Sequence, residues 1–348
     1  MNGLTISIER LVNGSGGDPC LYLDFPGKHN ALLFDTGELS ALPDAEVADT
    51  GFVLYSHFHM DHFVGFDRLL RLNIDKDKTI RVFGPPGTAQ RIGARLGSYQ
   101  YYRFPFMRLR FEVTEIDEPP ADAPPTLARP ARITRFDCQH SFEPEPQDTP
   151  VLLKRGVCHD NDDFRLHFAF VSHSVCCINY AMELKAGWMF DRGAAEEGVL
   201  KPGPWVRDVM AAMRLPATRR PQTVKVETGE FRLDDLVKQY FRRTARQKVV
   251  FMTDTRLTPE SRPRLKHLAK GATRLYADCY YPDDMGSRAD KYGHMTASQC
   301  AGLARDAKVK ELVLIHIGNS YHSRAAELLA QARTVFANTR MQFGEQTW

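Results

Sequence analysis

Three histidines and one aspartate fall within six consecutive positions, in the pattern His-x-His-x-Asp-His. They are His57, His59, Asp61 and His62. Imidazole nitrogens and carboxylate oxygens are the donors that Zn²⁺ and related divalent ions prefer. A chance cluster of histidines on a surface loop is the alternative, but an apolar run at 51–55 directly precedes the pattern. Four donors exceed what one open catalytic zinc needs, so the pattern predicts two adjacent metals.

The residues around this pattern predict a loop between a strand and a helix. Positions 51–55 are typical of a short buried strand, and a helical pattern begins at 66–70. A loop between two such elements lets four side chains converge on one point. A second apolar run, 31–34, ends at Asp35, which could orient a metal ligand from behind. Alternatively, Asp35 is an acidic residue in an ordinary turn and has no role at a metal site.

The second half of the chain repeats one arrangement, an apolar run that ends in an acid or a histidine. Asp254, Asp278 and His316 each close such a run, and His173 lies between two others. Helical patterns separate the runs, and one of them starts at His294. This order predicts an α/β protein whose metal ligands collect at one sheet edge.

Length and composition limit the class of protein. A chain of 348 residues with 43% hydrophobic residues can bury a substantial core, as one large domain with an insertion or as two domains. With no run of 18 apolar residues and no signal-peptide pattern at the start, we expect no membrane span and a cytoplasmic protein. The seven cysteines have no paired spacing except the adjacent Cys176 and Cys177, which fits a reducing compartment. These two are most simply buried strand residues, and metal ligation is their alternative role.

The basic charge is concentrated in one segment. Residues 201–248 hold 12 Lys or Arg and five Asp or Glu, whereas the whole chain carries a formal net charge of only +3. The remainder of the chain is therefore net acidic. Within the segment, 231–246 reads as an amphipathic basic helix. Such a segment suits a nucleic-acid contact, and a solvated basic face explains the composition equally well.

The motifs together resemble a known family. The pattern at 57–62, preceded by residues 32–37, resembles the signature of the metallo-β-lactamase fold. More narrowly, several stretches are similar, in the expected order, to ribonuclease Z, the endonuclease that trims the 3′ end of precursor tRNA. These stretches are 83–87, His173 with Tyr180, 190–204, 254–256, Asp278 with His294, and His316 with Tyr321.

The resemblance implies an architecture. It is a four-layer αββα metallo-β-lactamase sandwich, with residues 1–348 as a single domain and residues 186–247 as an inserted, protruding arm. The arm would be the substrate-binding exosite. Its candidate contact residues are Pro202, Gly203, Pro204, Arg242 and Arg243.

The resemblance also implies a set of metal ligands, carried over position by position. One metal would be held by His57, His59 and His173. The second metal would be held by Asp61, His62 and His316, with Asp254 bridging the two. The expected cofactors are two Zn²⁺ per subunit, and Mn²⁺ or iron would fit the same donors.

The implied reaction is hydrolysis of a phosphodiester. A hydroxide held between the two metals would attack phosphorus, remove the 3′ trailer of precursor tRNA and leave a 3′-hydroxyl on the tRNA. Asp61 could orient or deprotonate the water, while His294, held by Asp278, would donate a proton to the leaving oxygen. Asp278 stands where the family has Glu, which is one methylene longer.

Two other functions fit parts of the sequence. One is a related hydrolase of a small phosphodiester or another ester, in which the arm is a lid or a dimer contact. The other is a non-catalytic RNA-binding or scaffold protein that has kept the fold. The complete set of implied ligands and the basic arm favour the endoribonuclease, with precursor tRNA as partner and, as the resemblance implies, a homodimer in which one subunit's arm serves the other.

Overall fold

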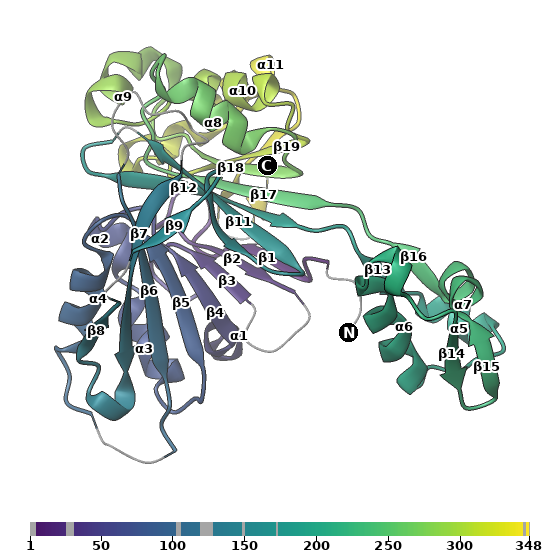
Figure 1. Ribbon diagram of the computed structural model, residues 1–348. Helices are drawn as coiled ribbons and strands as arrows, with labels where there is room; N and C mark the ends of the chain where they lie inside the picture. The colour runs from purple at the N-terminus through teal and green to yellow at the C-terminus, as the bar shows by residue number, and fades with distance from the viewer. Residues whose placement is uncertain are drawn as a thin grey trace.

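Two β-sheets face each other in the computed structural model, which describes residues 5–25, 31–101, 106–118, 128–147, 150–171, 173–343 and 346–347 (Figure 1). The first sheet has the strand order β1-β2-β3-β4-β5-β6-β7-β8, and β9 also pairs with β7. The second has the order β10-β11-β12-β17-β18-β19-β20. Each half of the chain thus builds one sheet.

The strands of the first sheet are β1 (Ile8–Leu11), β2 (Leu21–Asp24), β3 (Ala31–Phe34), β4 (Thr50–Leu54), β5 (Thr79–Gly84), β6 (Arg110–Ile116), β7 (Arg129–Asp137), β8 (Pro144–Pro146) and β9 (Val151–Leu153). Those of the second are β10 (Val157–Asp160), β11 (Phe164–Val171), β12 (Cys177–Leu184), β17 (Gln247–Met252), β18 (Arg274–Asp278), β19 (Glu311–Ile315) and β20 (Thr339–Arg340). A short pair, β21 (Gln342–Phe343) and β22 (Gln346–Thr347), follows near the C-terminus.

Helices cover the outer face of each sheet (Figure 1). Beside the first sheet lie α1 (Asp44–Asp49), α2 (Met60–Phe63), α3 (Phe66–Asn73) and α4 (Thr88–Leu96). Beside the second lie α8 (Ser261–Ala269), α9 (Gly286–Tyr292), α10 (Ala297–Asp306) and α11 (Ala325–Val335). Within the described residues, none of the helices is long and apolar enough to cross a membrane. The layers confirm the predicted αββα sandwich.

Side chains alternate along each strand between the two faces of its sheet, so each sheet packs against a different core on either face. In β17, Val249 and Phe251 face the core between the sheets, whereas Val250 and Met252 face the helical layer. All four side chains are buried. A strand covered on both faces reads as a continuous apolar run, which is why the strands were predictable.

A separate arm interrupts the second sheet between β12 and β17 (Figure 1). Its elements are β13 (Trp188–Phe190), α5 (Arg192–Glu197), α6 (Pro204–Arg214), β14 (Thr223–Val226), β15 (Gly229–Arg232), α7 (Leu233–Tyr240) and β16 (Phe241–Arg243). It encloses its own apolar core around Trp205 and Tyr240. The predicted helix at 231–246 was too long, because the chain leaves the helix after Tyr240 and pairs with β13.

Parallel strands bring the chemical residues to one edge. The strands β3, β4, β5 and β6 run parallel in the first sheet, as do β17, β18 and β19 in the second. The carboxyl ends of parallel strands meet at the same edge, where loops build ligand sites. The loops after β4, β17, β18 and β19 therefore lie close together, although they are far apart in sequence.

Candidate metal centre

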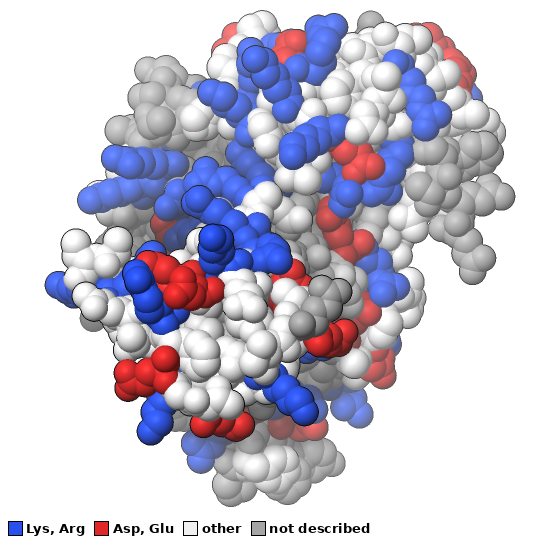
Figure 2. Space-filling model, turned by 90° about the vertical axis from the view of Figure 1, so that its right-hand side faces the viewer, with Lys and Arg blue, Asp and Glu red and all other residues white. Residues whose placement is uncertain are grey.

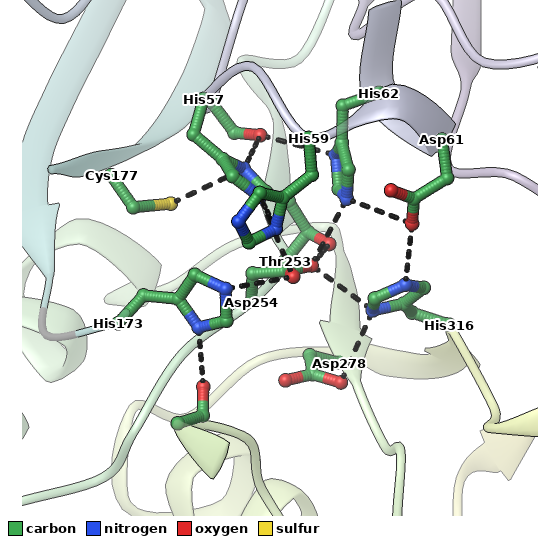
Figure 3. A network of polar contacts seen from close by, with 12 residues as sticks. His57, His59, Asp61, His62, His173, Cys177, Thr253, Asp254, Asp278 and His316 are labelled. Carbon is green, nitrogen blue, oxygen red and sulfur yellow. Dashed lines mark hydrogen bonds and ion pairs between the residues drawn. The ribbon is translucent and has the colours of Figure 1, made fainter. Parts of the chain in front are cut away.

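The loop after β4 supplies four of the predicted ligands. His57 and His59 lie in the loop, but Asp61 and His62 lie in the short helix α2, which begins at Met60. The prediction of a simple loop up to position 66 was therefore incomplete. The helical turn directs Asp61 and His62 toward the same point as the two loop histidines (Figure 3).

A first cluster unites His57, His59, His173 and Asp254, whose donor atoms all lie within 4.8 Å of one another. His57 Nε2 is 2.8 Å from His59 Nδ1, and His173 Nε2 is 3.3 Å from Asp254 Oδ2. These side chains come from the loop after β4, the loop before β12 and the end of β17. Only the packing of the two sheets against each other brings these four side chains together.

A second cluster unites Asp61, His62 and His316, again with donor atoms within 4.8 Å. His316 Nε2 is 3.2 Å and His62 Nε2 is 3.4 Å from Asp61 Oδ2. The other oxygen of Asp254 reaches this cluster, with Oδ1 3.0 Å from His316 Nδ1 and 3.3 Å from His62 Nε2. The two carboxylate oxygens of Asp254 thus face different clusters (Figure 3).

Three buried histidine nitrogens indicate that the clusters fit a cation. His62 Nε2, His173 Nε2 and His316 Nδ1 have no hydrogen-bond partner among the described residues, although carboxylate oxygens lie near them. A buried polar atom without a partner costs about 1–3 kcal/mol. Imidazole and carboxylate donors at this spacing suit zinc and similar ions. The two clusters can therefore hold divalent metal ions.

Asp35 orients His62 from behind. Its carboxylate accepts hydrogen bonds from the Ser56 backbone N–H at 2.7 Å, from Ser56 Oγ at 2.7 Å and from His62 Nδ1 at 2.8 Å. Because Nδ1 is engaged, Nε2 of His62 is the nitrogen presented to the centre. His173 is oriented in the same way, by donation from Nδ1 to the Gly293 carbonyl at 3.0 Å.

The backbone is strained where the strands end at the centre. Asp35, Asp254 and His316 have positive φ angles of 55°, 44° and 56°. Residues other than glycine rarely adopt this conformation, and such strain gathers at functional sites. Asp35 and His316 directly follow a strand, and Asp254 is the second residue after one. No sequence pattern marked these turns, since acids and histidines occur in many loops.

The pKa values of His57 and His173 are shifted in the direction that suits metal ligands. Burial lowers the pKa of His57 far below its ordinary value, as does the neighbouring His62, so its imidazole is neutral and ready to bind a cation. Burial also lowers the pKa of His173. Burial alone would raise the pKa of Asp254, but attraction to His316 and His62 outweighs it and holds this pKa low. Asp254 is therefore a carboxylate at neutral pH.

Asp278 and His294 form a pair beside the clusters. Asp278 is fully buried at the end of β18, and it accepts a hydrogen bond from His294 Nδ1 to Oδ2 at 3.0 Å. The aspartate thus reaches the histidine although it is shorter than the family's glutamate. Burial opposes a charge on His294, but attraction to Asp278 outweighs burial and raises its pKa. His294 also lies within 4.8 Å of Asp254 and His316, measured between donor atoms, so it borders the second cluster.

Sequence reasoning missed two residues that hold the site together, Tyr280 and Asn179. Tyr280 stacks on His294 with ring centroids 4.4 Å apart. Asn179 joins two strand ends, because its side chain donates to Thr255 Oγ1 at 2.6 Å and accepts from the Thr253 N–H at 3.1 Å. Neither residue belongs to a motif, so only their position in the fold reveals them.

Cys177 lies behind the centre and belongs to none of the candidate ligand groups among the described residues. Its sulfur is 3.9 Å from His57 Nδ1, the nitrogen that points away from the first cluster. Cys177 is fully buried as the first residue of β12, whereas Cys176 is partly exposed. The prediction of a buried strand residue is therefore confirmed for Cys177, but it was wrong for Cys176, which precedes the strand.

The candidate arm residues lie away from the clusters (Figure 1). Gly203 caps α6 and Pro204 is its first residue. Arg242 and Arg243 lie in β16, at the base of the arm, where Arg242 Nε pairs with Asp191 Oδ2 at 3.2 Å. The structure therefore does not bring these five residues, including Pro202, into contact with the metal centre.

Known proteins were compared with the chain by sequence and by structure. No family model matches the chain. Ribonuclease Z of Deinococcus radiodurans is 28% identical over 316 residues, which cover 89% of this chain and 89% of that protein. The metallo-β-lactamase fold protein YhfI from Bacillus subtilis superposes with a TM-score of 0.52 at 15% identity and covers 97% of both chains. The short form of human tRNase Z has a TM-score of 0.50 at 15% identity and covers 88% of this chain and 92% of that one.

The facing sheets and the His/Asp clusters at their common edge define a metallo-β-lactamase-fold protein with a candidate metal centre. By sequence, the chain is similar to ribonuclease Z proteins along most of its length. The predicted fold is thereby confirmed, and the sequence relatives agree with the predicted resemblance to ribonuclease Z.

Proposed function

We propose that the protein is an endoribonuclease that removes the 3′ trailer of precursor tRNA and leaves a 3′-hydroxyl on the tRNA. The observation that carries this proposal is Asp254, whose two oxygens face two separate ligand clusters in a chain similar to ribonuclease Z proteins. A shared carboxylate between two open sites suits phosphodiester hydrolysis.

The chain's own residues suggest how the centre is loaded. His57, His59 and His173 would hold one ion, and Asp61, His62 and His316 the other, with Asp254 between them. Two Zn²⁺ are the proposed cofactors, with Mn²⁺ or iron as alternatives. When bound, the ions lower the pKa of a water molecule and neutralise charge on the phosphodiester.

Two residues are placed to move protons. Asp61 is partly exposed, and the hydrogen bond from His316 together with the nearby His62 outweighs its burial and holds its pKa low, so it is a carboxylate that can orient the attacking water. His294 donates from Nδ1 to Asp278, which leaves Nε2 as the nitrogen that can give a proton to the leaving 3′-oxygen. Its raised pKa keeps that proton available near neutral pH.

The arm supplies the proposed grip on folded RNA. Exposed Lys and Arg side chains on α6, β16 and the turns between them would contact phosphates of the tRNA. We further propose a cytoplasmic homodimer in which the arm of one subunit serves the centre of the other. This assembly would explain why the arm residues lie away from the clusters of their own chain.

The test is cleavage of a precursor tRNA with a 3′ trailer, run beside hydrolysis of bis(p-nitrophenyl) phosphate. We expect the wild-type protein to cut directly after the discriminator base. Asp254→Asn should abolish both activities, because it removes a negative charge that both clusters share. The loss of activity should exceed the roughly 10–100-fold that follows when a residue supporting a ligand is changed. Arg242→Ala with Arg243→Ala should slow only the tRNA reaction.

Lys266→Ala changes an exposed residue of α8 outside the site and is the matched control for both reactions. Hydrolysis of the small diester with the tRNA left intact would rule out the endoribonuclease and point to a small phosphodiester as the substrate. If Asp254→Asn retained wild-type activity, the metal centre would have no part in either reaction.

A further inference from the structure

One wall of the cavity above the metal centre takes no part in the proposed metal binding or proton transfer. The cavity holds ≈ 510 Å³ and is lined by ligands such as Asp61, Asp254 and His316. Five further lining residues carry cationic or aromatic side chains. They are Arg256, Tyr281, Arg288, Lys291 and Tyr292. Three of these belong to α9 or its last turn, the segment that separates Asp278 from His294 in the sequence.

The segment α9 is held in place over the centre. Ala289 is fully buried in the core beneath it. Arg256, two residues after Asp254, donates to the Lys291 carbonyl at 3.4 Å and lies 3.6 Å from Asp290. These contacts connect the loop after β17, which carries Asp254, to α9.

Gly293 directs the side chains on either side of it to different places. It ends α9 with φ at 79°, and a Cβ at this position would lie 2.8 Å from His173 Nδ1. The turn sends His294 inward beside Asp278, while Tyr292 stays 47% exposed at the cavity. Lys291 Nζ lies 5.3 Å from the centroid of the Tyr292 ring. An exposed ring beside a cation is thus presented to whatever enters the cavity.

The charges of the wall suit an anionic chain. Among the described lining residues, the acids are Asp61 and Asp254, which both belong to the metal clusters. Arg288 and Lys291 are left to attract phosphate groups, whereas Arg256 is engaged with Asp290 and the Lys291 carbonyl. Sites for single-stranded nucleic acid combine cations for the backbone with aromatic rings on which bases stack. Figure 2, seen from the side of the arm, shows that Lys and Arg also gather over the upper half of that face.

We propose that α9 forms a subsite for one single-stranded nucleotide beside the scissile bond. Tyr292 stacks on its base, and Arg288 and Lys291 bind the phosphates that flank it. The subsite rests on the proposed endoribonuclease function and assigns part of the recognition to the core of the protein. The arm grips the folded body of the RNA, whereas α9 grips the strand that is cut. Because every base has a flat face, the subsite tolerates any sequence.

The decisive experiment removes the stacked base from the substrate and the Tyr292 ring from the protein, first separately and then together. Precursor tRNAs carrying one abasic nucleotide at each position next to the cut are compared with the intact substrate. For the wild-type protein we expect kcat/KM to fall about tenfold at the stacked position. Tyr292→Ala should cause the same loss on the intact substrate and no further loss on the abasic one, because both changes remove one interaction. Tyr292→Phe should retain nearly full activity.

The matched control is Tyr99→Ala, since Tyr99 is 45% exposed and lies outside this cavity. Arg288→Gln combined with Lys291→Gln should lower affinity for the RNA and reduce the dependence of binding on salt concentration. If Tyr292→Ala matches the wild type on every substrate, or if its effect multiplies with that of the abasic position, the subsite is overturned. If the wild-type protein leaves precursor tRNA intact, the proposed function fails first, and the subsite fails with it.

Discussion

At the scale of single residues, the centre depends on side chains that are aimed by others. Asp35 is not itself near the cavity, yet it accepts three hydrogen bonds and fixes which nitrogen of His62 faces the clusters. Its φ of 55° lies in a region that asparagine and aspartate enter more readily than other residues. A substitution that keeps the shape but removes the charge therefore isolates its aiming role.

We expect Asp35→Asn to weaken metal binding by roughly 10–100-fold while the fold is retained. Asparagine has one acceptor oxygen in place of two, so it cannot accept from both the Ser56 backbone N–H and His62 Nδ1, and the imidazole is held less firmly. Competition with a chelator measures the affinity, and circular dichroism checks the fold. Asp75→Asn, at an exposed acid away from the centre, is the control. Equal affinities of Asp35→Asn and the wild-type protein would contradict an aiming role.

At the scale of elements, the arm and the sandwich are separate packing units. The arm core contains no residue of the sandwich cores. Two short strands, β13 and β16, connect it to the second sheet, and they pair antiparallel with Met189 opposite Arg242. An ion pair from Arg214 to Asp163, at 3.0 Å, ties α6 to the sandwich. The sandwich should therefore fold without the arm.

Replacing residues 190–241 by Asn-Gly would close β13 and β16 with a two-residue turn. We expect the shortened protein to bind as much metal as the full chain, because every ligand lies outside the removed segment. Its melting temperature should change by less than about 5 °C, since few contacts cross the boundary. Its affinity for precursor tRNA should fall sharply. Loss of metal or of cooperative unfolding would show that the sandwich needs the arm.

At the scale of the whole molecule, the charge distribution explains how a nearly neutral chain can bind RNA. The formal net charge is +3, but 12 Lys or Arg lie within 201–248. Lys and Arg also gather in the region seen in Figure 2, and the α9 wall adds three cations beside the centre. Binding that depends on such groups releases counterions from the RNA and weakens as salt is added.

Raising KCl from about 50 to about 200 mM should therefore weaken binding of precursor tRNA at least about tenfold. The measurement is a fluorescence-anisotropy titration with Asp254→Asn, which binds without cutting. The slope of log affinity against log salt should be smaller for the protein without its arm. A slope that is the same for both proteins would exclude the arm from phosphate contacts.

Much of the fold was already determined by the sequence. Strands buried on both faces appear as apolar runs, and acids or histidines at their ends predicted a site at one sheet edge. Local spacing alone identified His57, His59, Asp61 and His62, because all four lie within six positions. His173, Asp254 and His316 were assigned as ligands through the resemblance, because they lie between 111 and 254 positions after His62 and only the fold brings them close to it.

Only the tertiary structure decided how these residues meet. The register between strands placed one oxygen of Asp254 toward each cluster, stacked Tyr280 on His294 and laid α9 along the cavity. Sequence patterns could not predict these contacts, because a pattern gives the periodicity within one helix or strand and not the register between two of them. Side-chain direction at a strand end depends on a single backbone turn, such as φ of 44° at Asp254. Such turns are stabilised by contacts from distant segments, and those contacts exist only once the sheets have packed.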